Sequence, residues 1–530
     1  MLSINKRLLL GFLVMLAAAA PDARDSAGVS TPTIRMASAG THHFPYLSSA
    51  LDLASHGYSE KEYLISGTAQ AYINDGPFRA NGVWNAIPNP GVTASFTVRL
   101  LVRRPTDAAR FNGVVLVEWL NVTGFHDIAP DWGWTHQELL REGYAYVGVT
   151  TQFLGAQALQ DWERGPADRY KAIFHPGDSF AFDIFSQAGQ AIAHPAAGGP
   201  RPLGELTPRI KALLADGESQ SANRLVTYYN SIHRLDRIYD GFLIHSTGYG
   251  GPLSNDVAAA DIPPPPGVPA TPFIFPPFPG EDPDFAIRTD LGTPLLFVNA
   301  EFDVLDFSVG GRSIHQQPDS HTFRLWEIAG TSHFDRYQLR VLEADLVKSD
   351  ALDLPPPGRA CDGPPLNTGP QKYVMRAAVH ALGRWVQTGR PPARAPRISV
   401  SVPPDWDTEV TINRDAATGL AIGGIRLPQI TVPTATHSGE RAWPDAWEPH
   451  PACFLWGTSD PWNGDSDTWD GQEGFDVSPT PEPDVKMLYG SHADYVARVA
   501  AAAARSVADG FLRRKDAALI VKEAASSKNP

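Results

Sequence analysis

The sequence predicts an α/β protein with a mostly parallel, doubly wound sheet, and two observations carry this prediction. Short apolar runs typical of buried strands alternate along the chain with segments whose apolar residues recur at helical spacing. Strands and helices that alternate in this way form a parallel sheet with helices on both faces. With 530 residues and 43% hydrophobic content, the chain is long enough to bury at least one large core.

The expected elements of this sheet can be placed in chain order. They are an antiparallel opening within 28–110, strands at 113–120 and 144–150 joined by a helix around 135–142, a helix at 180–193, a strand at 210–216, and strand runs at 239–246, 293–303 and 322–333. Polar residues that could carry chemistry follow the ends of several of these runs. Open parallel sheets place their active sites at such strand ends.

The turn after the strand at 210–216 carries the strongest functional signal. It has the sequence G-E-S-Q-S at 217–221, and apolar residues at helical spacing follow. A strand, a tight turn with a serine and then a helix is the setting of a nucleophile elbow. The small residue Gly217 is needed because the turn is strained and side chains crowd there. Ser219 is therefore the predicted nucleophile, with Ser221 in place of the last glycine of G-x-S-x-G.

The partners of a catalytic serine are a base and a carboxylate that orients the base. In α/β-hydrolases they follow in the order Ser, Asp or Glu, His. The run at 293–303 ends in two carboxylates, and the run at 322–333 ends in a small-residue turn and a histidine. His333 is the predicted base. Asp303 is the predicted acid, because P-L-L-F-V-N-A-E-F-D resembles a strand ending common in hydrolases, and Glu301 stays an alternative since it lies nearer the strand end.

An oxyanion hole needs two N–H groups near the nucleophile. The residue after the nucleophile, Gln220, supplies one, at the positive end of the helix that follows. The second comes from the loop 121–127, which follows the strand at 113–120. The sequence does not single out one donor within this loop.

The N-terminus has the pattern of an export signal. Basic residues precede the apolar run Leu8 to Ala20, which is followed by small residues suited to cleavage. This predicts a Sec-type signal peptide over 1–20 and a periplasmic or secreted protein. Cys361 and Cys453 are the only cysteines, and in an oxidising compartment we expect them to form a disulfide.

Charge and composition limit the partners. The net charge of −14, with 44 basic and 58 acidic residues and no basic cluster, argues against nucleic acid or an anionic membrane. No stretch after the signal peptide is apolar enough to predict a membrane span. The predicted chemistry requires neither a metal nor an organic cofactor. The expected partner is a small-molecule ester, and the oligomeric state is left open.

The predicted boundaries divide the chain into a catalytic domain at 28–396 and a C-terminal extension at 397–530. Residues 248–290 form a lid-like insertion rich in Pro, Gly and Phe, which excludes regular structure. A polyproline-like surface loop is the alternative for this segment. A helix at 374–388 is expected to close the catalytic domain. The extension is expected to contain a short strand at 398–402, a hairpin at 419–432 and a helix at 492–512.

Several of these segments resemble a known group. The sequence G-E-S-Q-S-A-N-R-L-V-T-Y-Y-N at 217–230 and three further matches, V-L-V-E-W-L-N-V at 115–122, G-G-I-R-L-P-Q-I-T-V-P-T-A at 423–435 and S-H-A-D-Y-V-A-R-V at 491–499, resemble bacterial alpha/beta hydrolase domain-containing proteins. The resemblance extends across nearly the whole chain after the signal peptide. It implies an α/β-hydrolase fold and a serine-hydrolase triad with Ser219 as nucleophile, and it implies no substrate.

Together these observations predict an exported serine hydrolase that cleaves a carboxylic ester through an acyl-enzyme. An acyltransferase or a lactonase would use the same triad, so the sequence does not separate them from an esterase. A catalytically silent binding protein on a hydrolase scaffold is the alternative from another class. The order Ser219, Asp303, His333 at strand ends argues against it, because a binding protein needs no such order.

Overall fold

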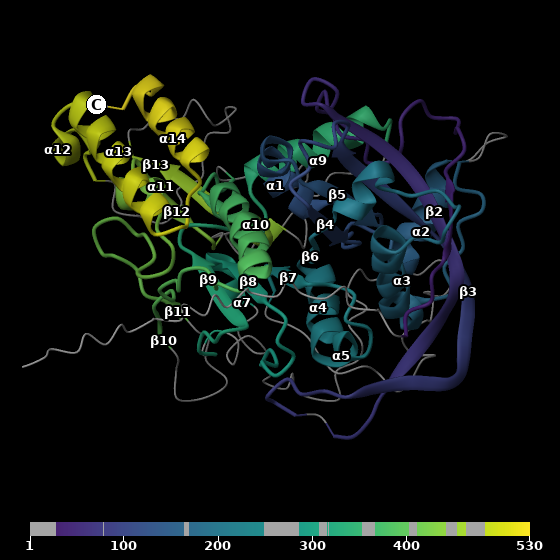
Figure 1. Ribbon diagram of the computed structural model, residues 1–530. Helices are drawn as coiled ribbons and strands as arrows, with labels where there is room; N and C mark the ends of the chain where they lie inside the picture. The colour runs from purple at the N-terminus through teal and green to yellow at the C-terminus, as the bar shows by residue number, and fades with distance from the viewer. Residues whose placement is uncertain are drawn as a thin grey trace, which may run out of the picture.

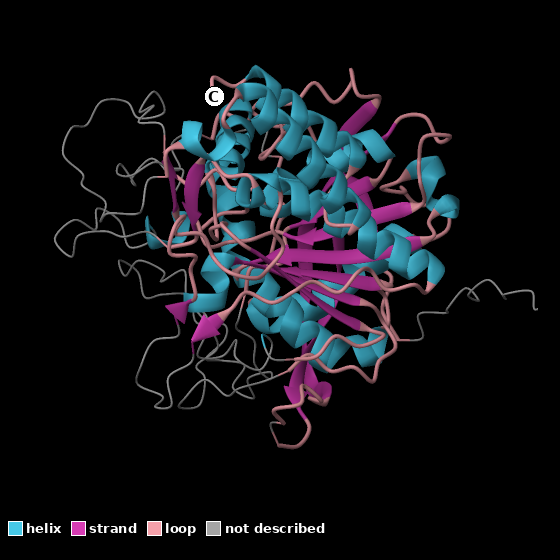
Figure 2. Ribbon diagram, turned by 90° about the vertical axis from the view of Figure 1, so that its left-hand side faces the viewer, coloured by secondary structure: helices cyan, strands magenta, loops and turns pink. Residues whose placement is uncertain are grey.

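The computed structural model describes residues 28–77, 79–163, 169–247, 286–306, 315, 317–351, 366–401, 411–440, 453–462 and 483–529. At its centre lies a 9-stranded sheet in the order β1-β2-β3-β5-β4-β6-β7-β8-β9. Figure 1 shows helices on both sides of this sheet, and Figure 2 shows the strands enclosed between the two helical layers.

The strands divide the sheet into an antiparallel edge and a parallel centre. Their bounds are β1 (Thr33–Met36), β2 (Tyr58–Asn74), β3 (Ala86–Pro105), β4 (Val114–Trp119), β5 (Ala145–Val149), β6 (Ala212–Glu218), β7 (Gly241–His245), β8 (Leu295–Ala300) and β9 (Phe323–Ile328). Strands β1, β2 and β3 pair antiparallel, and β3 also pairs antiparallel with β5. All the remaining pairs of this sheet are parallel. The predicted mostly parallel α/β sheet with an antiparallel opening is therefore confirmed.

Helices cover the sheet in two layers. The first half of the chain contributes α1 (Pro130–Glu142), α2 (Phe153–Trp162), α3 (Ala181–Ala193), α4 (Gln220–Thr227) and α5 (His233–Asp236), with a π-helical turn at Tyr228–Ile232. The second half contributes α7 (Glu301–Asp306), α9 (Arg336–Lys348), α10 (Gln371–Thr388), α11 (Pro428–Thr431), α12 (Val485–Tyr489), α13 (His492–Ala508) and α14 (Arg514–Ser526).

The core lies on both faces of the sheet because the central strands are buried along their full length. Alternate side chains of these strands point to opposite faces. Leu116, Leu214 and Leu243 pack with residues of α1 and α10. Val117 and Ala215 pack on the other face with residues of α3 and α4. Continuous apolar strands are expected where a parallel sheet is covered on both sides.

The C-terminal segment packs on the same core. Residues of α13 and α14 belong to the cluster that contains α10, and Asp516 of α14 accepts from Arg141 of α1 and Arg376 of α10. Two small sheets lie in this region, β10 (Val400–Ser401) with β11 (Thr411–Ile412) and β12 (Ala435–Ser438) with β13 (Thr458–Pro461). The segment thus contributes buried surface to the main domain.

Two expectations for this segment need correction. The hairpin expected at 419–432 is wrong, because α11 occupies Pro428–Thr431. Pro428 takes the first position of that helix, where a missing N–H costs no hydrogen bond. The single helix expected at 492–512 ends at Ala508, and a second helix, α14, follows it.

Some predictions fall on residues that the structure does not describe. The signal peptide at 1–20, residues 248–285 of the lid-like insertion, and Cys361 lie outside the described residues. The disulfide between Cys361 and Cys453 therefore stays a prediction. Among the described residues, no helix combines the length and apolar character needed to cross a membrane.

Candidate active site

Ser219 forms the turn that joins β6 to α4. Its backbone has φ 59° and ψ −120°, a region that a residue with a side chain occupies at a cost of about 1–3 kcal/mol. The N–H of Ser219 donates to the carbonyl of His245 (2.9 Å), and the carbonyl of Ser219 accepts from the N–H of Asn223 (3.0 Å). The side chain itself is half-buried. The strained backbone is therefore held from the neighbouring strand and from the first turn of α4.

Gly217 and Ser221, two positions to either side of Ser219 in the elbow, are small, which suits the limited space around this turn. A Cβ on Gly217 would lie 3.0 Å from Leu225 Cδ1 and 3.2 Å from Ser221 Oγ, so even an alanine would require these two side chains of α4 to shift. Ser221 is fully buried, and its hydroxyl donates to the carbonyl of Glu218 (2.8 Å). Ser221 thus contributes a structural hydrogen bond within the turn.

His333 and Asp303 lie together after the ends of β9 and β8. His333 Nδ1 is 2.7 Å from Asp303 Oδ1, and both side chains are buried. The other carboxylate oxygen of Asp303 accepts from the N–H of Ala300 (2.8 Å), which fixes the orientation of the carboxylate. The two residues come from the strand ends that the sequence indicates.

Glu301 has different partners, although it lies only two residues before Asp303. Its carboxylate accepts from the N–H groups of Gly330 (2.5 Å) and Gly439 (3.1 Å), and it forms an ion pair with Arg414 (2.8 Å). Gly439 and Arg414 belong to the C-terminal segment. Glu301 therefore connects the end of β8 to that segment, and Asp303 is the carboxylate that contacts His333.

The loop 121–127 lies against the elbow. The side-chain amide of Asn121 donates to the carbonyl of Glu218 (2.9 Å), and the backbones of Asn121 and Ile128 exchange two hydrogen bonds (3.0 and 2.8 Å). At the other end of the loop, buried Asp127 pairs with buried Arg99 (3.0 Å). The start of the loop is thus fixed at the elbow, and its end is fixed to Arg99 of β3.

Gln220 is the first residue of α4 and is half-buried. The N–H groups of the first helical turn have no acceptor within the helix and lie at its positive end. The N–H of Gln220 is therefore a group that can stabilise negative charge beside Ser219. The helix N-cap makes no side-chain hydrogen bond that would compete for it.

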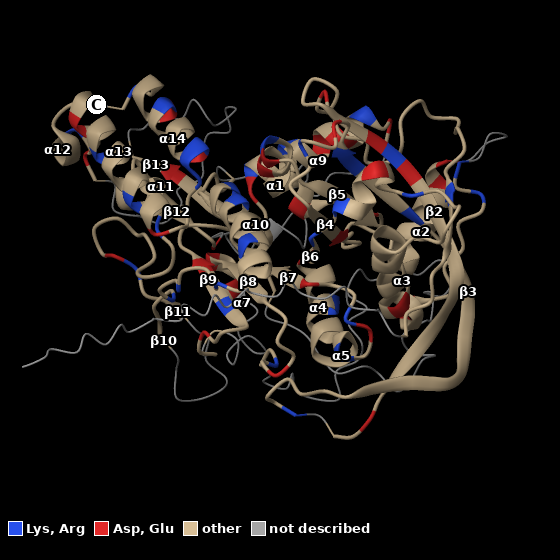
Figure 3. Cartoon of the chain, viewed as in Figure 1, with Lys and Arg blue, Asp and Glu red and all other residues tan. Residues whose placement is uncertain are grey.

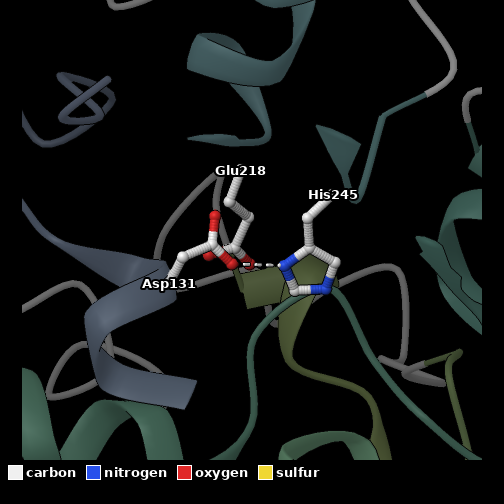
Figure 4. A group of neighbouring side chains, drawn as sticks. All are labelled: Asp131, Glu218 and His245. Carbon is white, nitrogen blue, oxygen red and sulfur yellow. Dashed lines mark hydrogen bonds and ion pairs between the residues drawn. The ribbon is translucent and has the colours of Figure 1, made fainter. Parts of the chain in front are cut away.

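A second histidine–carboxylate pair, which the sequence prediction missed, lies beside the elbow. His245 Nδ1 is 2.9 Å from Asp131 Oδ1, and both side chains are fully buried (Figure 4). Glu118, Asp216 and Glu218 are buried near this pair. The sequence does contain a pattern that points to Glu118, Asp216 and Glu218. Each is a carboxylate within or at the end of an apolar strand, and buried carboxylates are rarely found without a partner or a role.

Burial changes the protonation of this second group. Burial first, and then the charge of Asp131, raises the pKa of Glu118 to about 8. The pKa values of Asp216 and Glu218 are also raised well above their ordinary values, again by burial first and then by Asp131. Glu118 still has three donors: the N–H groups of Asp131 and Trp132 at the start of α1 (both 3.0 Å) and the hydroxyl of Tyr146 (2.7 Å).

Charged residues elsewhere are dispersed. In Figure 3, Lys and Arg positions are interspersed with Asp and Glu positions over the described helices and strands, and this view has no continuous basic stripe among them.

Comparison with known protein families agrees with the fold. The sequence matches the family of alpha/beta hydrolase domains over residues 29–522. A search among curated proteins finds no match. Among solved structures the chain is similar to a ferulic acid esterase from Streptomyces cinnamoneus, with 14% identity and a TM-score of 0.31, covering 62% of this chain and 91% of that one.

Two further structures are similar at the same low level. Esterase Est22 has 11% identity and a TM-score of 0.28, covering 57% of this chain and 80% of that one. A dienelactone hydrolase from Anabaena variabilis has 13% identity and a TM-score of 0.26, covering 48% of this chain and 89% of that one. Likenesses this weak say nothing about the substrate.

Proposed function

Since the chain belongs to the family of alpha/beta hydrolase domains, we propose that it is an exported serine hydrolase that cleaves a carboxylic ester through an acyl-enzyme. The observation that carries this proposal is the backbone of Ser219, at φ 59° and ψ −120° between β6 and α4. A serine held in this strained turn has its hydroxyl presented at the strand end, where a nucleophile is needed. Export rests on the N-terminal sequence at 1–20.

In this mechanism His333 takes the proton from Ser219 as the serine attacks the ester carbonyl. Asp303 accepts the Nδ1–H of His333, which keeps the imidazole in the tautomer whose Nε2 can act as base. His333 then returns the proton to the leaving alcohol. In the second half-reaction the same imidazole activates a water, which releases the acid and restores the serine.

The tetrahedral intermediate carries a negative oxygen that needs two donors. The N–H of Gln220 is the first. For the second we propose Val122, because the N–H groups of Asn121, Thr123 and Phe125 donate to other acceptors and, of the remaining loop residues, Val122 lies nearest in the chain to Asn121 at the elbow. Val122 is buried and directly follows Asn121, whose side chain contacts the elbow.

The substrate is proposed to be a small ester. The net charge of −14, with 44 basic and 58 acidic residues, supports a small molecule over a nucleic acid as the partner. No described feature distinguishes the acid and alcohol parts of the ester, so a panel of p-nitrophenyl esters of increasing acyl length is the first assay.

The direct test is the hydrolysis of these esters by the wild type and by two serine variants. We expect Ser219→Ala to lose at least about 10³-fold in kcat while its circular dichroism stays unchanged, because binding and the oxyanion hole retain only residual catalysis. Ser221→Ala is the matched control. It removes one buried hydrogen bond, worth about 1 kcal/mol, and keeps its activity. Substantial hydrolysis by folded Ser219→Ala would refute the proposal.

A further inference from the structure

A group of buried carboxyl side chains and one histidine lies beneath the elbow, on one face of the sheet. Glu118 of β4 lies opposite Asp216 of β6, and Glu218 of β6 lies opposite His245 of β7. Residues 216 and 218 are two apart on the same strand, so their side chains share a face. That face packs against α1, which supplies Asp131. All five side chains are fully buried.

Several oxygens of this group have no well-aligned donor among the described residues: both carboxylate oxygens of Asp216, Oδ2 of Asp131 and Oε1 of Glu218. The side chains of Asp216 and Asp131 lie close enough to share a proton, and Trp134 is a nearby donor to Glu218. The remaining oxygen of Glu218 accepts from the side-chain amide of Gln338 (2.8 Å). A buried carboxylate oxygen without a partner loses its hydration and gains nothing in return, which is costly.

We propose that Asp131, Glu218 and His245 bind one divalent cation of the zinc type. Each of the three offers a ligand atom, and these atoms all lie within 4.8 Å of one another. Figure 4 shows both carboxylates directed toward the imidazole. An imidazole nitrogen with carboxylate oxygens is a donor set that zinc accepts, whereas calcium and magnesium prefer oxygen ligands alone.

The second nitrogen of His245 fits this assignment. Nε2 of His245 lies 3.1 Å from the side-chain amide of Gln371, whose oxygen has no hydrogen-bond partner among the described residues. With the amide turned by 180°, an assignment that is open for any Gln, this oxygen accepts from Nε2–H. Nδ1 then carries a lone pair directed at the carboxylates. Histidines that bind metals commonly donate their other N–H in this way.

Shared protons are the competing occupant of this group. A proton bridges two oxygens at a time, whereas the three ligand atoms here lie mutually close and include a nitrogen. A cation contacts all three ligand atoms at once and takes the place of the protons that these carboxyl groups would otherwise hold. The geometry therefore favours a cation over a set of two-centre hydrogen bonds.

The site would act on stability and not on the chemical step. Glu218 directly precedes Ser219, and the carbonyl of His245 accepts the N–H of Ser219. A cation bound to both residues would fix β6 to β7 at the elbow and fix the start of α1 to them. All three ligand residues are fully buried and none belongs to the proposed triad, so hydrolysis through Ser219 does not depend on the cation for its chemistry.

The test measures metal directly on the full chain. The wild type is purified without chelator, its metal content is determined by mass spectrometry, and the metal-free form is titrated with Zn²⁺ and, separately, with Ca²⁺. We expect one zinc per chain, tighter binding of Zn²⁺ than of Ca²⁺, and an increase of several degrees in Tm when Zn²⁺ is added. Absence of bound metal together with a Tm that Zn²⁺ does not change would overturn the proposal in favour of shared protons.

Two variants locate the site, and a third controls for burial. Glu218→Gln and His245→Gln each remove one ligand, and we expect both to lose the bound zinc. Asp236→Asn removes an equally buried carboxyl that contacts Ser186 and Tyr228, in the core on the opposite face of the sheet, and should keep it. Zinc retained by both ligand variants would place the metal elsewhere. Metal content and Tm are read without an ester substrate, so failure of the proposed hydrolase activity would not affect this result.

Discussion

The two buried histidine–carboxylate pairs of this protein have almost the same local geometry and different surroundings. Nδ1 of His333 lies 2.7 Å from Asp303, and Nδ1 of His245 lies 2.9 Å from Asp131. The first pair follows the ends of β9 and β8. The second pair joins the end of β7 to the first turn of α1. A short contact between histidine and carboxylate is thus not sufficient to identify a catalytic base.

The surroundings distinguish the two pairs. His245 is bonded through both ring nitrogens, to Asp131 and to Gln371, and further buried carboxyl groups lie beside it. An imidazole held in this way has no nitrogen with which to take a proton from a serine. His333 instead follows the end of β9, in the chain order Ser, Asp, His of the proposed triad, and its contact Asp303 is oriented by the N–H of Ala300. We therefore propose a catalytic role for the pair of His333 and a structural role for the pair of His245.

The largest expected difference comes from removing each histidine. We expect His333→Ala to lower kcat on the order of 10⁵-fold, because loss of the base is comparable to loss of the nucleophile. His245→Gln should keep kcat within about 10-fold per folded molecule, since only its backbone carbonyl contacts Ser219. Steady-state kinetics on a p-nitrophenyl ester, normalised to the folded fraction by circular dichroism, would measure both. Equal losses would remove the distinction between the two pairs.

The two neighbouring carboxylates offer the next largest effect. Asp303→Asn should lower kcat about 10⁴-fold, because an amide cannot hold the tautomer of His333 that acts as base. Glu301→Gln should leave kcat nearly unchanged and lower the free energy of unfolding by about 2 kcal/mol, because it weakens a largely buried pair with Arg414. Kinetics and urea unfolding of both variants separate these outcomes. The reverse ranking would make Glu301 the catalytic acid.

Asp236 is a buried carboxyl group that contacts hydroxyl groups, and it gives a third case to compare with the two histidine–carboxylate pairs. Asp236 accepts from the hydroxyls of Ser186 and Tyr228, and burial raises its pKa to about 7. The folded state therefore holds a proton that the unfolded state has lost, so stability falls as pH rises from about 4 to 7 and changes no further above that. In Asp236→Asn this fall should be absent.

The effect of Asp236→Asn is read as a difference between the two proteins at each pH. The free energy of unfolding of the variant relative to the wild type should increase by up to about 4 kcal/mol between pH 4 and pH 8. Urea unfolding at four pH values across this interval would measure it. A difference that does not change with pH would mean that Asp236 is ionised in the folded protein.

The sequence predicted the parallel sheet well because buried parallel strands leave a plain signal. The runs V-V-L-V-E-W of β4 and L-L-F-V-N-A of β8 are apolar almost throughout, since both faces of these strands are covered. The turn at Ser219 could also be predicted from the sequence, because Gly217, Ser219 and the helix after them are adjacent in the chain. Candidates for the base and acid were found through their positions after strand ends.

The other features could not be predicted from the sequence, because they depend on contacts between residues that lie far apart in the chain. The interactions of Glu301 with Gly439 and of Arg141 with Asp516 join residues more than one hundred positions apart. The group around His245 draws on three strands and the start of α1, and its members look like isolated polar residues within apolar runs. In the C-terminal segment, residues of α13 and α14 pack in the cluster that contains α10, and a four-residue helix such as α11 is too short to show a helical periodicity in the sequence.

The central claim is that Ser219 is the nucleophile, and covalent labelling tests it most directly. The purified protein is treated with a fluorophosphonate, and the modified peptide is identified by mass spectrometry. The account predicts one adduct on Ser219, no adduct in Ser219→Ala, and strongly slowed labelling in His333→Ala because the base is missing. An adduct on Ser221 or another residue, or a folded wild type that is not labelled at all, would contradict the account.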